Sequence, residues 1–131
     1  MPEKHLFEYA VLRIVPQVER EEFLNTGVIL YCPKQKFLRV RLAFDEARLQ
    51  AFAPSLDAQT LRANLAALER ICHGHPDGGP IARLEPAARF RWLTATRSTV
   101  LQSSKIHPGL CDDAEAALER LFASIVAIAP C

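Results

Sequence analysis

The segment from Ser103 to Asp113 gathers side chains that could perform chemistry. Its sequence is Ser-Ser-Lys-Ile-His-Pro-Gly-Leu-Cys-Asp-Asp, so a histidine, a thiol and two carboxylates stand just before an amphipathic run. A cysteine with a histidine can form a nucleophile and its base. Asp112 with Glu115 also resembles a capping box that has Asp in place of Ser or Thr. We favour capping for Asp112, expect Asp113 to be the first helical residue, and keep His107, Asp112 and Asp113 as a candidate functional loop.

Residues of zinc-binding type occur in two segments that we expect to be loops. They are Cys72, His73, His75, His107 and Cys111. Their spacing matches no standard finger or ribbon, and Cys72 lies on the apolar stripe of a predicted helix, where small buried thiols are common. We therefore expect no metal site and no cofactor. The sequence leaves open whether the two segments converge.

A second group of residues could bind an anion. Arg91 and Arg97 lie on either side of Trp92, and Ser98 follows directly. Guanidinium forks and hydroxyl groups bind phosphate and carboxylate oxygens. A solvated face whose arginines pair with glutamates is the plainer explanation, and we favour it slightly. If a site exists here, we place it at Arg91, Arg97 and Ser98. A strand over 98–106 would hold its two ends apart, so we rank His107 and Asp112 lower.

Length and charge narrow the class of protein. The chain has 131 residues, which suits one domain over 1–131. Sixteen basic and 15 acidic residues give a net charge of +1, which argues against broad attraction to nucleic acids or membranes. No apolar run is long enough to span a membrane, and the first residues show no signal-peptide pattern. We expect a cytoplasmic protein whose four cysteines are free thiols.

Hydrophobic periodicity predicts the elements that would position these residues. Apolar side chains on both faces of 6–15 indicate a central strand. We expect the following further elements: one or two helical turns over 19–25 ended by Asn25 and Gly27, a hairpin with arms 28–32 and 37–43, a short helix capped by Asp45, a helix from Ser55 or Asp57 to Cys72, a loop over 73–80, a helix over 86–94, a strand over 98–106, and a last helix from Asp112.

Together these elements predict an α+β fold, a small antiparallel sheet of three to four strands covered by three to four helices. Arg13, Arg39 and Arg41 would then share one face of the sheet. Aromatic side chains such as Phe7 and Tyr9 would belong to the core. If helices covered only one face, some of them would contact a partner or another subunit.

Two long motifs resemble a known bacterial family, domain of unknown function 3037. The first is Phe-Glu-Tyr-Ala-Val-Leu-Arg-Ile-Val-Pro followed by Glu-Arg-Glu-Glu-Phe-Leu-Asn-Thr-Gly-Val-Ile-Leu-Tyr-Cys. The second is Phe-Arg-Trp-Leu-Thr-Ala-Thr-Arg-Ser-Thr-Val-Leu-Gln followed by His-Pro-Gly-Leu-Cys-Asp-Asp. The resemblance implies no established activity and no catalytic residues. It directs attention to these motif residues: Phe23, Asn25, Gly27, Val28, Arg91, Trp92, Arg97, Ser98, Asp112 and Asp113.

The resemblance also implies a partner, because genes of this family often lie beside a HipA-like kinase gene. We therefore favour a non-enzymatic interaction or regulatory protein, with a HipA-like kinase as the candidate partner. The alternative is a nucleic-acid- or nucleotide-phosphate-handling enzyme that uses the arginine, serine and aspartate residues. A metal-binding module is a third hypothesis. The sequence does not determine the oligomeric state or whether the protein is an enzyme.

Overall fold

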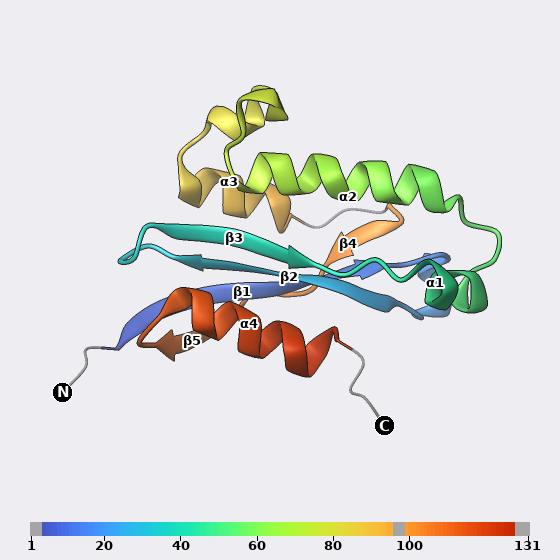
Figure 1. Cartoon of the computed structure of the whole chain (residues 1–131), viewed down its shortest axis with the longest axis horizontal. Coiled ribbons are helices and arrows are strands. Elements are labelled where there is room, and N and C mark those ends of the chain that lie inside the picture. Colours follow the sequence, from blue (N-terminus) through green and yellow to red (C-terminus); the bar gives the residue numbers. More distant parts are fainter. Residues whose placement is uncertain (1–3, 96–98, 128–131) are drawn as a thin grey trace.

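Strand β1, His5–Ile14, is the centre of an antiparallel sheet in the computed structural model, which describes residues 4–95 and 99–127. Apolar side chains on both of its faces allow it to be covered from both sides. Its neighbours are β2, Leu24–Cys32, on one side, and β4, Leu101–Ser103, with β5, His107–Cys111, on the other. The predicted α+β class and the central position of this strand are confirmed (Figure 1).

Strands β2 and β3, Phe37–Leu42, form the predicted hairpin. However, β2 begins at Leu24, so the prediction of helical turns through Asn25 is wrong. Only Val18–Arg20 forms a 3-10 turn, η1. Gly27 does not end a helix. It lies where a Cβ would come within 2.6 Å of Leu42 and 2.9 Å of a backbone oxygen, so close strand packing requires glycine there.

Strands β4 and β5 run along the same edge of β1. Leu12 pairs with Ser103, whereas Tyr9 pairs with His107, so one extra residue lies between the two strands. Ser104 accommodates this bulge because its backbone N–H donates to Val11 O and its hydroxyl accepts from Val11 N–H, both at 2.8 Å. The predicted strand over 98–106 is therefore shorter, and residues 107–111, expected to be a loop, form a fifth strand among the described residues.

One face of the sheet is covered by α2, Ala58–Cys72, and α3, Pro86–Leu93 (Figure 1). The shorter α1, Glu46–Phe52, lies between β3 and α2 in the chain. Asp45 caps α1 by accepting from Arg48 N, as predicted, and of the two expected starts of α2, Ser55 and Asp57, it is Asp57 that caps the helix by accepting from Gln59 N. The 73–80 segment contains a 3-10 turn, η2, Pro76–Gly78, and is followed by another, η3, Ile81–Arg83.

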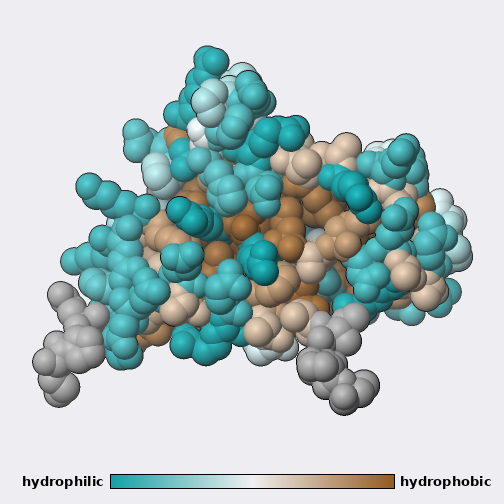
Figure 2. Space-filling view, in the orientation of Figure 1, coloured by the Kyte–Doolittle hydropathy of each residue, from teal (hydrophilic) through white to brown (hydrophobic). Residues whose placement is uncertain are grey.

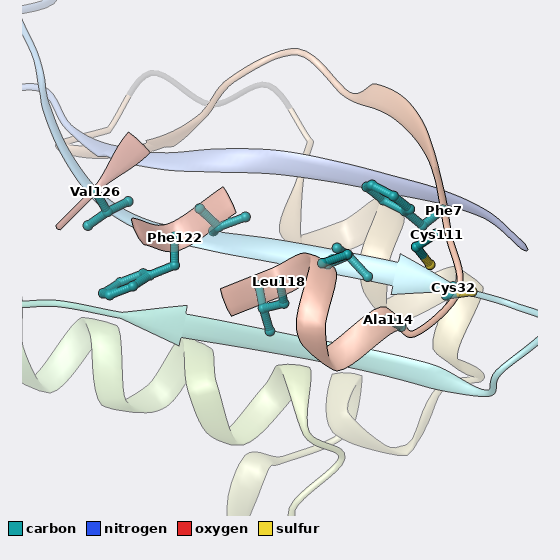
Figure 3. Close-up of a cluster of buried hydrophobic side chains, with 10 residues drawn as sticks. Phe7, Cys32, Cys111, Ala114, Leu118, Phe122 and Val126 are labelled. Carbon is teal, nitrogen blue, oxygen red and sulfur yellow. The ribbon is translucent and has the colours of Figure 1, made fainter. Parts of the chain in front are cut away.

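The opposite face is covered by α4, Ala114–Ile125. Leu118 and Phe122 of this helix pack with Phe7 of β1, all of them buried (Figure 3). The cap of α4 is Asp113, which accepts from Ala116 N at 3.1 Å, so the prediction that Asp112 caps this helix is off by one residue. In the described parts of the chain no helix has the length and apolarity needed to cross a membrane.

Candidate functional site

The three residues of the candidate functional loop make separate contacts. The ring of His107, on β5, lies 5.3 Å from the ring of Tyr9. The Asp112 carboxylate forms an exposed ion pair with Lys4 at 3.1 Å, and Asp113 caps α4. Because Cys111 is four residues from His107 on the same strand, about 13 Å of extended chain separates them. The geometry therefore does not pair this thiol with this imidazole.

The zinc-type residues do not converge. Cys72 belongs to the core cluster under α2 and α3, whereas Cys111 belongs to the cluster under α4, on the opposite face of the sheet. His75 Nδ1 accepts from the backbone N–H of Asp77. No group of three or more potential ligands among His, Cys, Asp and Glu occurs within residues 4–95 and 99–127.

Burial also raises the pKa of two thiols, Cys72 and Cys111, which favours their protonated form. It raises the pKa of Cys72 to about 12. Burial likewise raises the pKa of Cys111, with a smaller contribution from neighbouring Cys32. Thiolates, rather than thiols, are the nucleophiles and metal ligands of proteins, so these cysteines are typical of an inert core.

Of the three proposed anion-binding residues, Arg91 alone falls within the described part of the chain. Arg91 is exposed on α3, whereas Arg97 and Ser98 lie outside the described residues. Next to Arg91 in the chain, Trp92 lines a groove of about 440 Å³ between α2, α3 and the segment from Thr99 to Ser103. Asp112 and Asp113 lie at the start of α4, which covers the other face of the sheet. The structure does not bring these aspartates together with Arg91.

The three arginines expected on one sheet face do share the face covered by α4, but their surroundings differ. Arg41 lies over the Phe122 ring and pairs with Glu119 at 3.4 Å. Arg39, on the same edge strand, is exposed. Arg13 lies on the central strand, 4.0 Å from the ring centre of Phe23, and its buried Nε has no hydrogen-bond partner.

A surface at the opposite end of β1 was missed by the sequence analysis. Leu6 and Leu110 pair directly across β1 and β5, and they remain 58% and 62% exposed. Ile106 and Pro108, also exposed, alternate with Leu110 along the same segment. We call Leu6, Ile106, Pro108 and Leu110 the β5 patch. The alternation of apolar residues over 106–110 is the signal that would have revealed it, had this segment been treated as a strand.

Further apolar surface gathers on the face shown in Figure 2, over the strands between α2 and α4. Partly buried residues of β3, α2 and α4 pack against the two main core clusters: Phe37, Leu42, Leu68 and Leu121. The edge strand β3 is partly protected, since His73 Nε2 accepts from the outward backbone N–H of Val40 at 3.4 Å. The side chains here are more buried than those of the β5 patch.

Fold and surfaces thus define a small α+β protein with a helix-covered sheet, one groove-lining tryptophan and an uncovered strand face. The chain belongs to the family described as "Protein of unknown function (DUF3037)", whose model matches residues 9–126. The resemblance seen in the sequence motifs is therefore confirmed. Searches of curated proteins and of solved structures found no match.

Proposed function

We propose that this protein acts by binding another protein, and that the β5 patch is its docking surface. The observation that carries the proposal is the exposure of Leu6 and Leu110, which face solvent side by side where α2 and α3 do not cover the sheet. Large apolar side chains that cluster at the surface are typical of interaction sites. The proposed occupant is the HipA-like kinase that the family resemblance suggests.

Pro108 favours docking onto the side chains over addition of a strand. A proline has no N–H to offer to a further strand, and edge prolines discourage edge-to-edge pairing. Pro108 is the second residue of β5 and lies opposite Glu8. A partner would therefore contact the leucine pair from above the sheet, and we expect an apolar anchor on the partner side.

Co-elution with the neighbouring kinase tests this proposal. We expect the native chain and the kinase to migrate together in size-exclusion chromatography. The double variant Leu6→Lys/Leu110→Lys should lose the complex, because two charges would be buried in the interface. Leu84→Lys, at an exposed leucine outside the patch, is the matched control and should retain the complex.

Circular dichroism of the double variant establishes that the sheet is intact. Co-elution that survives in this variant would refute the patch as the docking surface. If the native chain alone elutes as a dimer that the double variant dissociates, the occupant is a second copy and the kinase proposal fails.

A second candidate function, nucleotide-phosphate handling, is supported by the groove beside Trp92. Its volume of about 440 Å³ falls in the range of small-molecule sites. Its apolar lining could hold a base, and Arg91, Arg97 and Ser98, which lie close in the chain to the lining residues Trp92 and Thr99, are the candidates for phosphate contact. Trp92 is the chain's single tryptophan, so its fluorescence would report on this groove.

Titration with ATP and ADP tests this second candidate. Saturable change of the fluorescence that is lost in Arg97→Ala and retained in His107→Ala would support it. A larger loss at His107, with the fold intact by circular dichroism, would reverse the proposed ranking of these residues. No saturable change would remove the candidate.

A further inference from the structure

Arg13 carries a positive charge in the interior of the sheet, where charged side chains are uncommon. It lies on the central strand β1, directly opposite Asn25 of β2 and Gln102 of β4. The side chain is partly buried, and its Nε is shielded from water without a hydrogen-bond partner. Its guanidinium lies over the ring of Phe23, at 4.0 Å from the ring centre.

This contact does not replace a counter-charge. Partial burial carries part of the desolvation cost of a charged group, which reaches several kcal/mol for full burial, and a cation–π contact returns about 0.5–2 kcal/mol. The lysine and arginine ion pairs found among the described residues lie at the exposed surface: Lys4–Asp112, Arg20–Glu22, Arg41–Glu119 and Arg62–Glu46. None of them involves Arg13, so the positive charge on the central strand stays uncompensated by these carboxylates.

Asn25 offers a complementary polar atom. Its Nδ2 donates weakly to Ile125 O at 3.5 Å, whereas its buried Oδ1 has no donor. A guanidinium Nε–H and an amide oxygen on paired residues of one face are natural partners. A hydrogen bond between them would hold the guanidinium so that its terminal nitrogens remain available.

The backbone directs both side chains. The pairing of β1 with β2 shifts between Leu12 and Arg13, so Thr26 is an extra residue in β2. Thr26 is held by its hydroxyl, which donates to Ala43 O at 2.7 Å. Bulges of this kind re-aim neighbouring side chains and are common next to binding sites.

We propose that Arg13 binds an oxyanion, a carboxylate or a phosphate group, on its terminal nitrogens. Phe23 covers the guanidinium, and Asn25 is a positioning residue that orients it. Bidentate recognition of such groups is the characteristic role of arginine. The site is independent of the β5 patch, because Arg13 and Leu6 lie near opposite ends of β1 and on opposite faces of the sheet.

Nuclear magnetic resonance of the ¹⁵N-labelled full chain tests this proposal. The probes are inorganic phosphate and acetate, titrated against chloride at constant ionic strength while the Nε–H resonance of Arg13 is followed. We expect saturable shifts with at least one of the two anions. A response that grows linearly and never saturates would overturn the proposal, because it indicates ion screening only.

Three variants, followed through backbone amide resonances near Arg13, assign the site. Arg13→Gln should weaken binding by at least about tenfold. Arg39→Gln removes another arginine that lies near a phenylalanine ring on the same sheet face, and it should bind as the native chain does. If Arg13→Gln fails to fold, the variant Asn25→Asp tests the proposal instead. Its carboxylate would form an ion pair with the Arg13 guanidinium and so abolish anion binding, whereas unchanged anion binding in Asn25→Asp would overturn the proposal.

The two anions distinguish the source of the ligand group. Tighter binding of acetate supports an acidic side chain of a partner, and tighter binding of phosphate supports a phosphorylated ligand. Because neither result depends on the kinase, failure of the co-elution experiment and failure of the anion titration can be told apart.

Discussion

Gln35 joins the turn of the β2–β3 hairpin to the first residue of α4, Ala114. Its amide oxygen accepts from Ala114 N–H at 2.8 Å, and its amide nitrogen donates to Asp112 O at 2.7 Å. One side chain thus satisfies a free donor at a helix start and a backbone carbonyl beside it. The hairpin and the last helix are held together although 79 residues separate Gln35 from Ala114.

Replacing Gln35 should weaken the fold. Two hydrogen bonds of about 0.5–1.5 kcal/mol each are lost in Gln35→Ala, so we expect a decrease of about 1–3 kcal/mol in the free energy of unfolding. Lys34→Ala, at an exposed position of the same turn, is the control and should change it by less than about 0.5 kcal/mol. Urea unfolding measures both. Equal effects at the two positions would show that the amide contact is not formed in solution.

Asp113 should matter more to stability than Asp112. Loss of the capping carboxylate in Asp113→Ala should cost about 0.5–2 kcal/mol. Asp112→Ala removes an ion pair with Lys4 in which both side chains are more than half exposed, and such pairs contribute about 0–1 kcal/mol. Thermal unfolding of the two variants compares them directly. A larger loss for Asp112→Ala would place the helix start one residue earlier.

Gly109 should not tolerate a side chain. It pairs with Phe7, and a Cβ at this position would lie 2.4 Å from the buried phenyl ring. Overpacking of this kind costs about 1–3 kcal/mol, which we expect for Gly109→Ala in chemical denaturation. Leu110→Ala, at the exposed neighbour, should have little effect. Recovery of stability in the double variant Gly109→Ala/Phe7→Leu would identify the ring contact as the cause.

His73 should make the fold less stable in mild acid. Partial burial lowers the pKa of His73 below its ordinary 6.5, and the nearby cations Arg39 and Arg89 act in the same direction while Glu69 opposes them. The unfolded chain therefore binds this proton more readily. Stability is retained above pH about 6.5 and is lost as the pH falls through the lowered pKa. Protonation also removes the acceptor of the Val40 N–H.

Urea unfolding at pH about 5 and pH about 7 measures this dependence. His73 is only partly buried, so we expect a small effect. The difference in the free energy of unfolding between the two pH values should be smaller in His73→Gln and should persist in the control variant, His75→Gln. An unchanged dependence in His73→Gln would assign the effect to other groups.

Local patterns in the sequence were sufficient for many elements. Apolar side chains on both faces of the segment predicted β1 as a central strand. The 3.6-residue spacing of Leu61, Leu65 and Cys72 predicted α2, because residues at this spacing lie on one buried face of a helix. Asp45 and Asp57 could be recognised as candidate helix caps, because a cap acts within one turn of its own chain. The family could also be recognised from its motifs.

Only the tertiary structure decided what residues 107–111 and Arg13 do. A five-residue segment with a central proline and glycine has weak strand propensity, and β5 exists because it pairs with β1 about a hundred residues away. That pairing puts Gly109 under Phe7, exposes Leu110 beside Leu6, and moves the helix start to Asp113. The separation of Cys72 from Cys111, and the lack of a counter-charge beside Arg13 among the described residues, depend likewise on which strands become neighbours. Such long-range pairing depends on the packing of the whole sheet, so it cannot be predicted from a local sequence pattern.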